Sequence, residues 1–239
     1  MREETVVKNL RDIKDLFDKH AISYWLDSGT LLGAVRDGKL IEWDSDVDLG
    51  VWDNDVHRII SIFPEFNRRG FDIVLNRKLG VMEITRFNTK IWFCLYRRKG
   101  DYAWVVWLIR KGKWIEKIAD RFKDISNVRA YVRHKESFVR KVKYLSSLLP
   151  STLKQLVTYI AWITYCRVSF IFPIVVPKRY FEKLSTIRFY GIVFSIPSEV
   201  EKYLEYRYGS DWKTPKRKWI HYKDDGAINP DWSAYAKKA

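Results

Sequence analysis

The sequence predicts a mixed α/β (α+β) fold in which a mixed sheet is flanked by helices. Strand-like stretches cluster in the N-terminal half, helical apolar patterns lie towards both ends, and 47% of the 239 residues are hydrophobic. A chain of this length and apolar content can bury a substantial core, and its composition is not that of a disordered protein.

The first expected elements are a helix, a strand and a short second helix. Residues 1–20 carry apolar side chains at helical spacing: Val6, Leu10, Ile13 and Phe17. The stretch ISYWLDS, residues 22–28, is typical of a strand. The second helix is expected to begin at a cap supplied by Ser28 or Thr30 and to end at Gly38.

Three aspartates alternate with apolar residues directly after this helix, in WDSDVDLGV, residues 43–51. The alternation predicts a strand with Asp44, Asp46 and Asp48 on one face. Its inward-facing residues are expected to be Val47, Leu49 and Val51. Three carboxylates on one face repel each other and raise one another's pKa unless a cation lies among them.

The acidic strand has three possible interpretations. A solvated acidic face is the simplest. An EF-hand calcium loop also begins D-x-D-x-D, but it needs glycine at the sixth position and glutamate at the twelfth, where this chain has Leu49 and Asp55. A site for Mg²⁺ or Mn²⁺ is the third, and it is favoured because carboxylates suit these hard cations.

The middle of the chain continues the alternation of helix and strand. After a helix at residues 53–66, strands are expected at residues 70–76, 80–87, 90–98 and 102–109, the last of them a strand or a buried segment. Asn88 and Thr89 are expected to form the turn before the third of these strands. Towards the end of the chain, a helix opened by Ser198 and Glu201 is expected to stop at Gly209.

Residues 156–176, LVTYIAWITYCRVSFIFPIVV, are nearly all apolar or aromatic and are flanked by basic residues. A membrane-spanning helix, a buried hairpin and an interfacial helix are all compatible with this pattern. Arg167 and Pro173 disfavour the spanning helix. The chain is therefore divided into a core at 1–125, an apolar helical segment at 126–185 and a C-terminal segment at 186–239 that packs on the core.

The net charge of +15 implies an anionic partner. Nucleic acid, anionic lipid and phosphorylated small molecules are the candidates, and the sequence lacks the RNA-binding and zinc-finger signatures that would favour nucleic acid. We expect residues 140–185 to contact an anionic membrane surface. No secretory signal opens the chain, so a cytoplasmic location, peripheral at the inner face of the membrane, is expected.

A helix start beside a strand of carboxylates is a coherent phosphate-binding arrangement. The helix amino end offers N–H groups to phosphate oxygens, and Gly29 allows close approach of the backbone. The carboxylates can hold divalent ions that stabilise charge during displacement at phosphorus.

Two motifs carry a resemblance to a known family. DSGTLLGAVRDGKLIEWDSDVDLG, residues 27–50, and VEKYLEYRYGSDWKTP, residues 200–215, resemble the LicD and fukutin family of phosphotransferases, which have a nucleotidyltransferase-like fold. The motifs occur in the family's order, about 150 residues apart. The resemblance covers both ends of the chain well and the middle poorly.

The resemblance implies a function and a set of site residues. The family transfers an alcohol phosphate, such as phosphocholine or ribitol phosphate, from a CDP-linked donor to a hydroxyl of a glycan or lipid-linked glycan. By position, Asp46 and Asp48 would hold Mg²⁺ or Mn²⁺, with Asp44 beside them. The residues expected near the donor are Ser28, Gly29, Thr30, Arg36, Arg207, Tyr208, Trp212 and Lys213.

One position departs from the family pattern. A third acidic residue is expected on a later strand, and this chain has Trp92 there. The hairpin turn proposed above would place Glu83 on the same sheet face as Trp92, one diagonal step away, so Glu83 is the candidate replacement. Two other functions are compatible with the sequence: a nucleotidyltransferase acting on a small molecule or RNA, and a catalytically degenerate, membrane-associated member of the fold.

Overall fold

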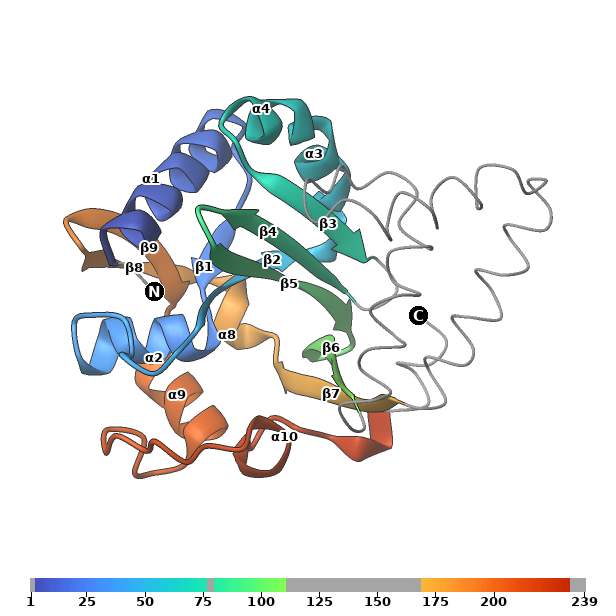
Figure 1. Ribbon diagram of the computed structural model, residues 1–239. Helices are drawn as coiled ribbons and strands as arrows, with labels where there is room; N and C mark the ends of the chain where they lie inside the picture. Colours follow the sequence, from blue (N-terminus) through green and yellow to red (C-terminus); the bar gives the residue numbers. More distant parts are fainter. Residues whose placement is uncertain (1–2, 77–79, 111–168, 233–239) are drawn as a thin grey trace.

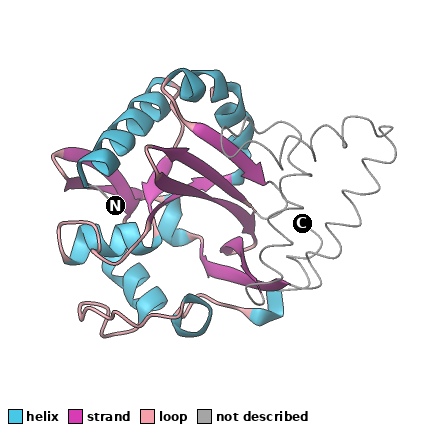
Figure 2. Ribbon diagram, viewed as in Figure 1, coloured by secondary structure: helices cyan, strands magenta, loops and turns pink. Residues whose placement is uncertain are grey.

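The structure is a computed structural model that describes residues 3–76, 80–110 and 169–232. These residues form a mixed α+β fold with a central sheet and helices packed around it (Figures 1 and 2). The strands of this sheet are β1 (Tyr24–Leu26), β2 (Asp46–Trp52), β3 (Asp72–Asn76), β4 (Val81–Arg86), β5 (Thr89–Lys99), β6 (Tyr102–Arg110) and β7 (Ser169–Pro177). The expected fold class is confirmed.

The sheet is mostly antiparallel, in the order β1-β2-β5-β4-β3, with β6 joining the far end of β5 and β7 pairing with β6. β2 and β5 are the exception, because they run parallel, with Asp46 opposite Lys90 and Asp48 opposite Trp92. A separate hairpin is formed by β8 (Leu184–Phe189) and β9 (Ile192–Pro197). The parallel pair therefore places Trp92 beside the acidic strand.

Helix α1 (Glu3–Lys19) confirms the predicted N-terminal helix. Its apolar stripe is buried: Val6, Leu10, Ile13 and Phe17 are each at most 1% exposed. The predicted second helix forms α2 (Ser28–Arg36), and the region expected at 53–66 forms a 3-10 turn at Asp53–Asp55 followed by α3 (Val56–Ser61) and α4 (Phe63–Arg68). In the view of Figure 1, α1, α3 and α4 lie above the sheet and α2 lies below it.

The cap of α2 differs from the expectation. Asp27 is the N-cap, and its side chain accepts a hydrogen bond from the Ser28 N–H at 2.8 Å. Ser28 follows in a left-handed conformation with φ 46°, a strained geometry for a residue with a side chain. The sequence DSGT offers three oxygen-bearing side chains, and Asp27 takes the capping role because it lies in the fully buried junction with β1.

The acidic strand alternates as predicted from Asp46 onwards. Val47, Leu49 and Val51 are all fully buried on one face. Asp44 lies before the strand begins, so Asp46 and Asp48 share the strand face and Asp44 approaches from the preceding turn.

The β4–β5 turn is one residue earlier than predicted. Arg86 pairs with Thr89, so Phe87 and Asn88 form the turn, with φ values of 50° and 60° that fit a type I′ geometry. When a two-residue turn moves by one position, the partner of each β4 residue on β5 changes by two residues. Each side chain therefore stays on the same face of the sheet as its new partner. Glu83 is therefore directly opposite Trp92 rather than diagonal to it, and the prediction that they share a face is correct.

The apolar segment 126–185 lies mainly outside the described residues, and its described end is not helical. Ser169–Pro177 form strand β7, followed by the short helix α8 (Arg179–Glu182). The helical expectation for residues 169–177 is wrong because an unbroken apolar run does not distinguish a buried strand from a helix, and Phe, Ile and Val favour the strand. No helix among the described residues is long and apolar enough to cross a membrane. The division at 125 and 185 stays a prediction.

The C-terminal segment returns to the core through helix α9 (Val200–Tyr208), which Gly209 ends with φ 85°. Its N-cap is Glu199, with no side-chain capping bond, so the predicted capping box at Ser198 is wrong. Beyond it lie α10 (His221–Asp224) and a 3-10 turn at Pro230–Trp232. Residues 227–229 run along β7, where the Val175 N–H donates to the Ala227 carbonyl at 2.8 Å.

Candidate active site

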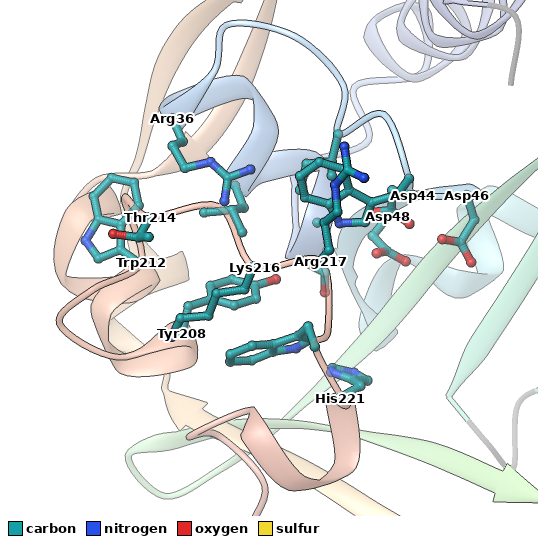
Figure 3. Close-up of a pocket in the computed structure, with 16 residues that line it drawn as sticks. Arg36, Asp44, Asp46, Asp48, Tyr208, Trp212, Thr214, Lys216, Arg217 and His221 are labelled. Atoms are coloured by element: carbon teal, nitrogen blue, oxygen red, sulfur yellow. The ribbon is translucent and has the colours of Figure 1, made fainter.

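A pocket with a volume of about 380 Å³ lies between α2, the start of β2 and the segment after α9. Figure 3 shows the labelled aspartates on one side of it and Tyr208, Trp212 and Lys216 on the other. Its walls are Ser28, Gly29, Leu32, Arg36, Ile41, Trp43, Asp44, Asp46, Asp48, Tyr208, Trp212, Thr214, Lys216, Arg217, Trp219 and His221. The two motifs predicted from the sequence thus meet in one cavity.

The acidic wall is formed by Asp44, Asp46 and Asp48. Burial, followed by repulsion from Asp46, raises the pKa of Asp44 to about 6. Burial raises the pKa of Asp48 well above its usual value, and Asp46, Asp27 and Asp44 raise it further. Asp48 is 6% exposed, and its Oδ1 has no hydrogen-bond partner among the described residues. This wall therefore carries negative charge that the described side chains do not balance.

This imbalance fits a divalent cation, because a cation would remove the repulsion between the carboxylates and would take Asp48 Oδ1 as one of its ligands. Among the described residues, no three carboxylate, imidazole or thiol side chains converge as a ready-made metal site.

Trp92 contacts the acidic wall directly. Its indole Nε1–H donates a hydrogen bond to Asp46 Oδ2 at 3.0 Å. Glu83 lies on the next strand, opposite Trp92, and does not line the pocket. Two strand spacings, roughly 9.6 Å, separate the backbones of Glu83 and Asp48. The hypothesis that Glu83 supplies the third carboxylate stays a prediction.

Three of the four predicted residues on α2 line the pocket: Ser28, Gly29 and Arg36. A Cβ on Gly29 would lie 2.2 Å from Asp44 Oδ2, so glycine is needed there for the carboxylate to approach the helix. Thr30 is 2% exposed, and its Oγ1 accepts a hydrogen bond from the Asp48 N–H at 2.9 Å. Thr30 therefore fixes the acidic strand to α2 and does not face the pocket, contrary to the expectation.

Arg207, which was expected near the donor, also does not line the pocket. It is fully buried behind the pocket, where its guanidinium donates to both oxygens of Asp225, at 2.6 to 2.9 Å. Its Nη1 donates to the Tyr203 hydroxyl at 2.8 Å and lies 3.6 Å from Asp27. Arg207 thus connects the C-terminal segment with the cap of α2.

Asp27 receives further donors in this buried network. The hydroxyls of Tyr203 and Tyr96 donate to its carboxylate at 2.6 and 2.8 Å. Arg207 Nη2 also lies 3.5 Å from Ser28 Oγ, at the edge of hydrogen-bond distance. The network holds α2, β5 and α9 in fixed relation and so positions the two walls of the pocket.

The remaining predicted residues divide between the pocket and the surface. Tyr208 and Trp212 line the pocket and are 9% and 6% exposed. Lys213 does not; it lies 3.5 Å from Glu201, and its side chain is 66% exposed. Arg36 lines the pocket while donating to Asp37 at 2.7 and 2.9 Å.

Sequence reasoning missed a basic and aromatic group in the same pocket: Trp43, Lys216, Arg217, Trp219 and His221. The signal for all of them except Trp43 was the run KRKWIH, residues 216–221, just beyond the second motif. Trp219 packs on Tyr208 with 5.1 Å between ring centroids. Burial lowers the pKa of His221, although its Nδ1 lies 3.3 Å from Asp225, so this histidine is neutral near pH 7.

Comparison with known proteins agrees with the resemblance. Residues 21–127 match the family described as "LicD/FKTN/FKRP, nucleotidyltransferase domain". The chain is 30% identical over 101 residues to an uncharacterised protein, RP689, of Rickettsia prowazekii, covering 42% of this chain and 37% of that protein. It is 46% identical over 46 residues to the human protein named ribitol 5-phosphate transferase FKRP, covering 19% of this chain and 9% of that protein. The chain thus matches less than half the length of each relative.

Among solved structures, the solution structure of the antibiotic-resistance factor ANT(2″)-Ia matches 69% of this chain and 95% of its own, with 14% identity and a TM-score of 0.34. A crystal structure of ANT(2″)-Ia with adenylyl-2″-tobramycin matches 67% of this chain and 99% of its own, with 14% identity and a TM-score of 0.32. Scores at this level do not establish a common architecture in detail.

Proposed function

Because residues 21–127 belong to the LicD/FKTN/FKRP family of nucleotidyltransferase domains, we propose that this chain is a divalent-cation-dependent phosphotransferase. It moves an alcohol phosphate, of the ribitol-phosphate or phosphocholine type, from a CDP-linked donor to a hydroxyl of a glycan or lipid-linked glycan. The observation that carries the proposal is a single pocket in which three aspartates face aromatic and basic side chains.

The acidic wall supports the cation part of the proposal. Asp46 and Asp48 would hold Mg²⁺ or Mn²⁺, with Asp44 as a further oxygen ligand. The bound cation would neutralise charge on the phosphoryl oxygens. Trp92 keeps Asp46 in place through its indole N–H, and Thr30 keeps the Asp48 backbone in place.

The other side of the pocket supports the donor part. The Gly29 backbone N–H lies in the first turn of a nine-residue helix, where anions bind favourably, whereas the Ser28 N–H already donates to Asp27. The rings of Tyr208, Trp212 and Trp219 offer apolar faces of the kind that stack on a nucleobase. The wall therefore suits a ligand that has both a phosphate and a base.

The experiment is a screen for CMP release from CDP-ribitol, CDP-choline and CDP-glycerol, with a glycan acceptor and with Mg²⁺, Mn²⁺ or EDTA. One donor is expected to release CMP, and EDTA is expected to abolish the release. CMP release that persists in EDTA would contradict the cation requirement.

Further assays separate the rival functions. A nucleotidyltransferase would release pyrophosphate from a nucleoside triphosphate, and one that acts on RNA would bind RNA with a steep salt dependence. A degenerate protein would neither turn over a donor nor bind a divalent cation. The proposed contact of residues 140–185 with anionic vesicles concerns mostly residues outside the described ranges and is tested by co-sedimentation with anionic against neutral vesicles.

A further inference from the structure

Three basic side chains line the pocket, and they differ in their acidic partners. Arg36 donates two hydrogen bonds to Asp37, and Lys216 forms an ion pair with Asp211 at 2.7 Å. Arg217 has no carboxylate partner within the described ranges 3–76, 80–110 and 169–232. Its positive charge is therefore the one in the pocket wall that no described carboxylate balances.

Arg217 is nevertheless held in a defined place. Its guanidinium carbon lies 5.4 Å from the centroid of the Trp43 ring, which is 43% exposed. Trp43 directly precedes Asp44, whereas Arg217 comes from the C-terminal segment, so this contact joins the two walls of the pocket. A cation–π contact uses the flat face of the guanidinium and leaves the N–H groups at its edge available to an acceptor.

The charges around Arg217 define the ligand class. Asp44, Asp46 and Asp48 would repel an anion, but they would attract one that carries a divalent cation. A ligand between these carboxylates and Arg217 therefore needs oxygens for the cation and further oxygens for the guanidinium. A diphosphate has both sets, and bidentate recognition of phosphate oxygens is typical of arginine.

We propose that Arg217 is the binding residue for the diphosphate of the donor and that Trp43 holds its guanidinium ready in the pocket. The assignment rests on the proposed function for the identity of the donor, but the anion site itself does not. Arg36 and Lys216, whose charges are already balanced by neighbouring acids, contribute less to diphosphate affinity.

The test is calorimetric titration of inorganic pyrophosphate and of CDP, each with Mg²⁺, into the wild-type protein, Arg217→Ala and Lys218→Ala. Arg217→Ala is expected to weaken both ligands about tenfold or more, because it removes a charge-assisted contact from the pocket. Lys218→Ala is the matched control, because it removes one positive charge from the adjacent residue, which is exposed and does not line the pocket. It should change the affinity for either ligand by less than about twofold.

Two further variants separate charge from geometry. Arg217→Lys keeps the charge but loses the planar fork and the stacking, so its affinity should lie between wild type and Arg217→Ala. Trp43→Ala should weaken pyrophosphate about threefold, because the guanidinium loses a contact worth roughly 0.5–1 kcal/mol at an exposed site.

The outcomes distinguish this proposal from the proposed function. Equal pyrophosphate affinity in wild type and Arg217→Ala would overturn the Arg217 assignment, as would failure of the wild type to bind pyrophosphate. If pyrophosphate binding depends on Arg217 but CDP binds no better than pyrophosphate, the anion site stands and the cytidine donor is contradicted.

Discussion

Two groups of carboxylates lie next to each other in this protein and differ in how their charge is balanced. Asp27 and Asp225, 0% and 4% exposed, are surrounded by donors, with Arg207 between them and tyrosine hydroxyls on Asp27. On the pocket side, Asp48 is almost as buried, but its Oδ1 has no described partner.

The difference separates a structural role from a ligand-binding one. A buried carboxylate that has its full set of donors holds elements together, and adding a cation would not improve it. A buried carboxylate that lacks a hydrogen-bond donor and lies beside two others lowers the stability of the folded state. A bound cation can restore that stability. We infer that the first group positions the pocket and the second group binds the cation.

The largest expected effect is on the balanced group. Arg207→Met leaves two buried carboxylates without their shared cation and should reduce the free energy of unfolding by about 3–5 kcal/mol. Urea unfolding measures this effect, with the exposed Lys213→Ala as the control that should remain unchanged. A loss below about 1 kcal/mol in Arg207→Met would mean that the network does not hold the C-terminal segment.

Substitutions in the unbalanced group should lower activity rather than stability. Asp46→Asn and Asp48→Asn should each reduce cation-dependent turnover by 100-fold or more, roughly 3 kcal/mol of transition-state stabilisation, while the fold stays intact. Steady-state rates and circular dichroism on the same samples separate the two effects. Near-normal turnover in either variant would refute the role of these aspartates.

Glu83 tests whether a further carboxylate completes the unbalanced group. If Glu83 supplies it, Glu83→Gln should lower turnover as much as losing a metal ligand does. Turnover is measured with the donor identified by the CMP screen. Normal rates in Glu83→Gln would show that Asp44, Asp46 and Asp48 suffice without it.

The smallest effect is the pH dependence of stability without divalent cation. A carboxyl whose folded pKa is raised binds more protons in the folded state, so its contribution to stability is present at low pH and is lost as pH rises through the folded pKa. The stability of Asp48→Asn relative to wild type should therefore increase from pH 5 to pH 7.5, by on the order of 1 kcal/mol. Urea unfolding in EDTA at both pH values measures it, and a pH-independent difference would contradict the raised pKa of Asp48.

Local sequence patterns predicted the features that depend on neighbouring residues. The spacing of Val47, Leu49 and Val51 was enough to place Asp46 and Asp48 on one strand face, and the motif around Gly29 placed α2 beside them. These predictions succeeded because side-chain alternation and helix starts are decided within a few residues.

Features that depend on distant residues could not be predicted in this way. The burial of Arg207 depends on Asp225, which lies beyond the second motif, and on Asp27, at the opposite end of the chain. The Phe87–Asn88 turn requires a positive φ at a phenylalanine, which local preferences disfavour. Arg217 and Trp43 meet only because the C-terminal segment folds over the acidic strand.

The most direct test of whether the unbalanced carboxylates bind a cation is Mn²⁺ binding at pH 7.5. Electron paramagnetic resonance measures it on wild type, Asp48→Asn and Lys213→Ala. Wild type and Lys213→Ala are expected to bind Mn²⁺ equally, and Asp48→Asn is expected to bind it at least about tenfold more weakly, because the ion loses a charged ligand. Equal Mn²⁺ binding by wild type and Asp48→Asn, or no binding by the wild type, would contradict the claim that the unbalanced carboxylates form the cation site.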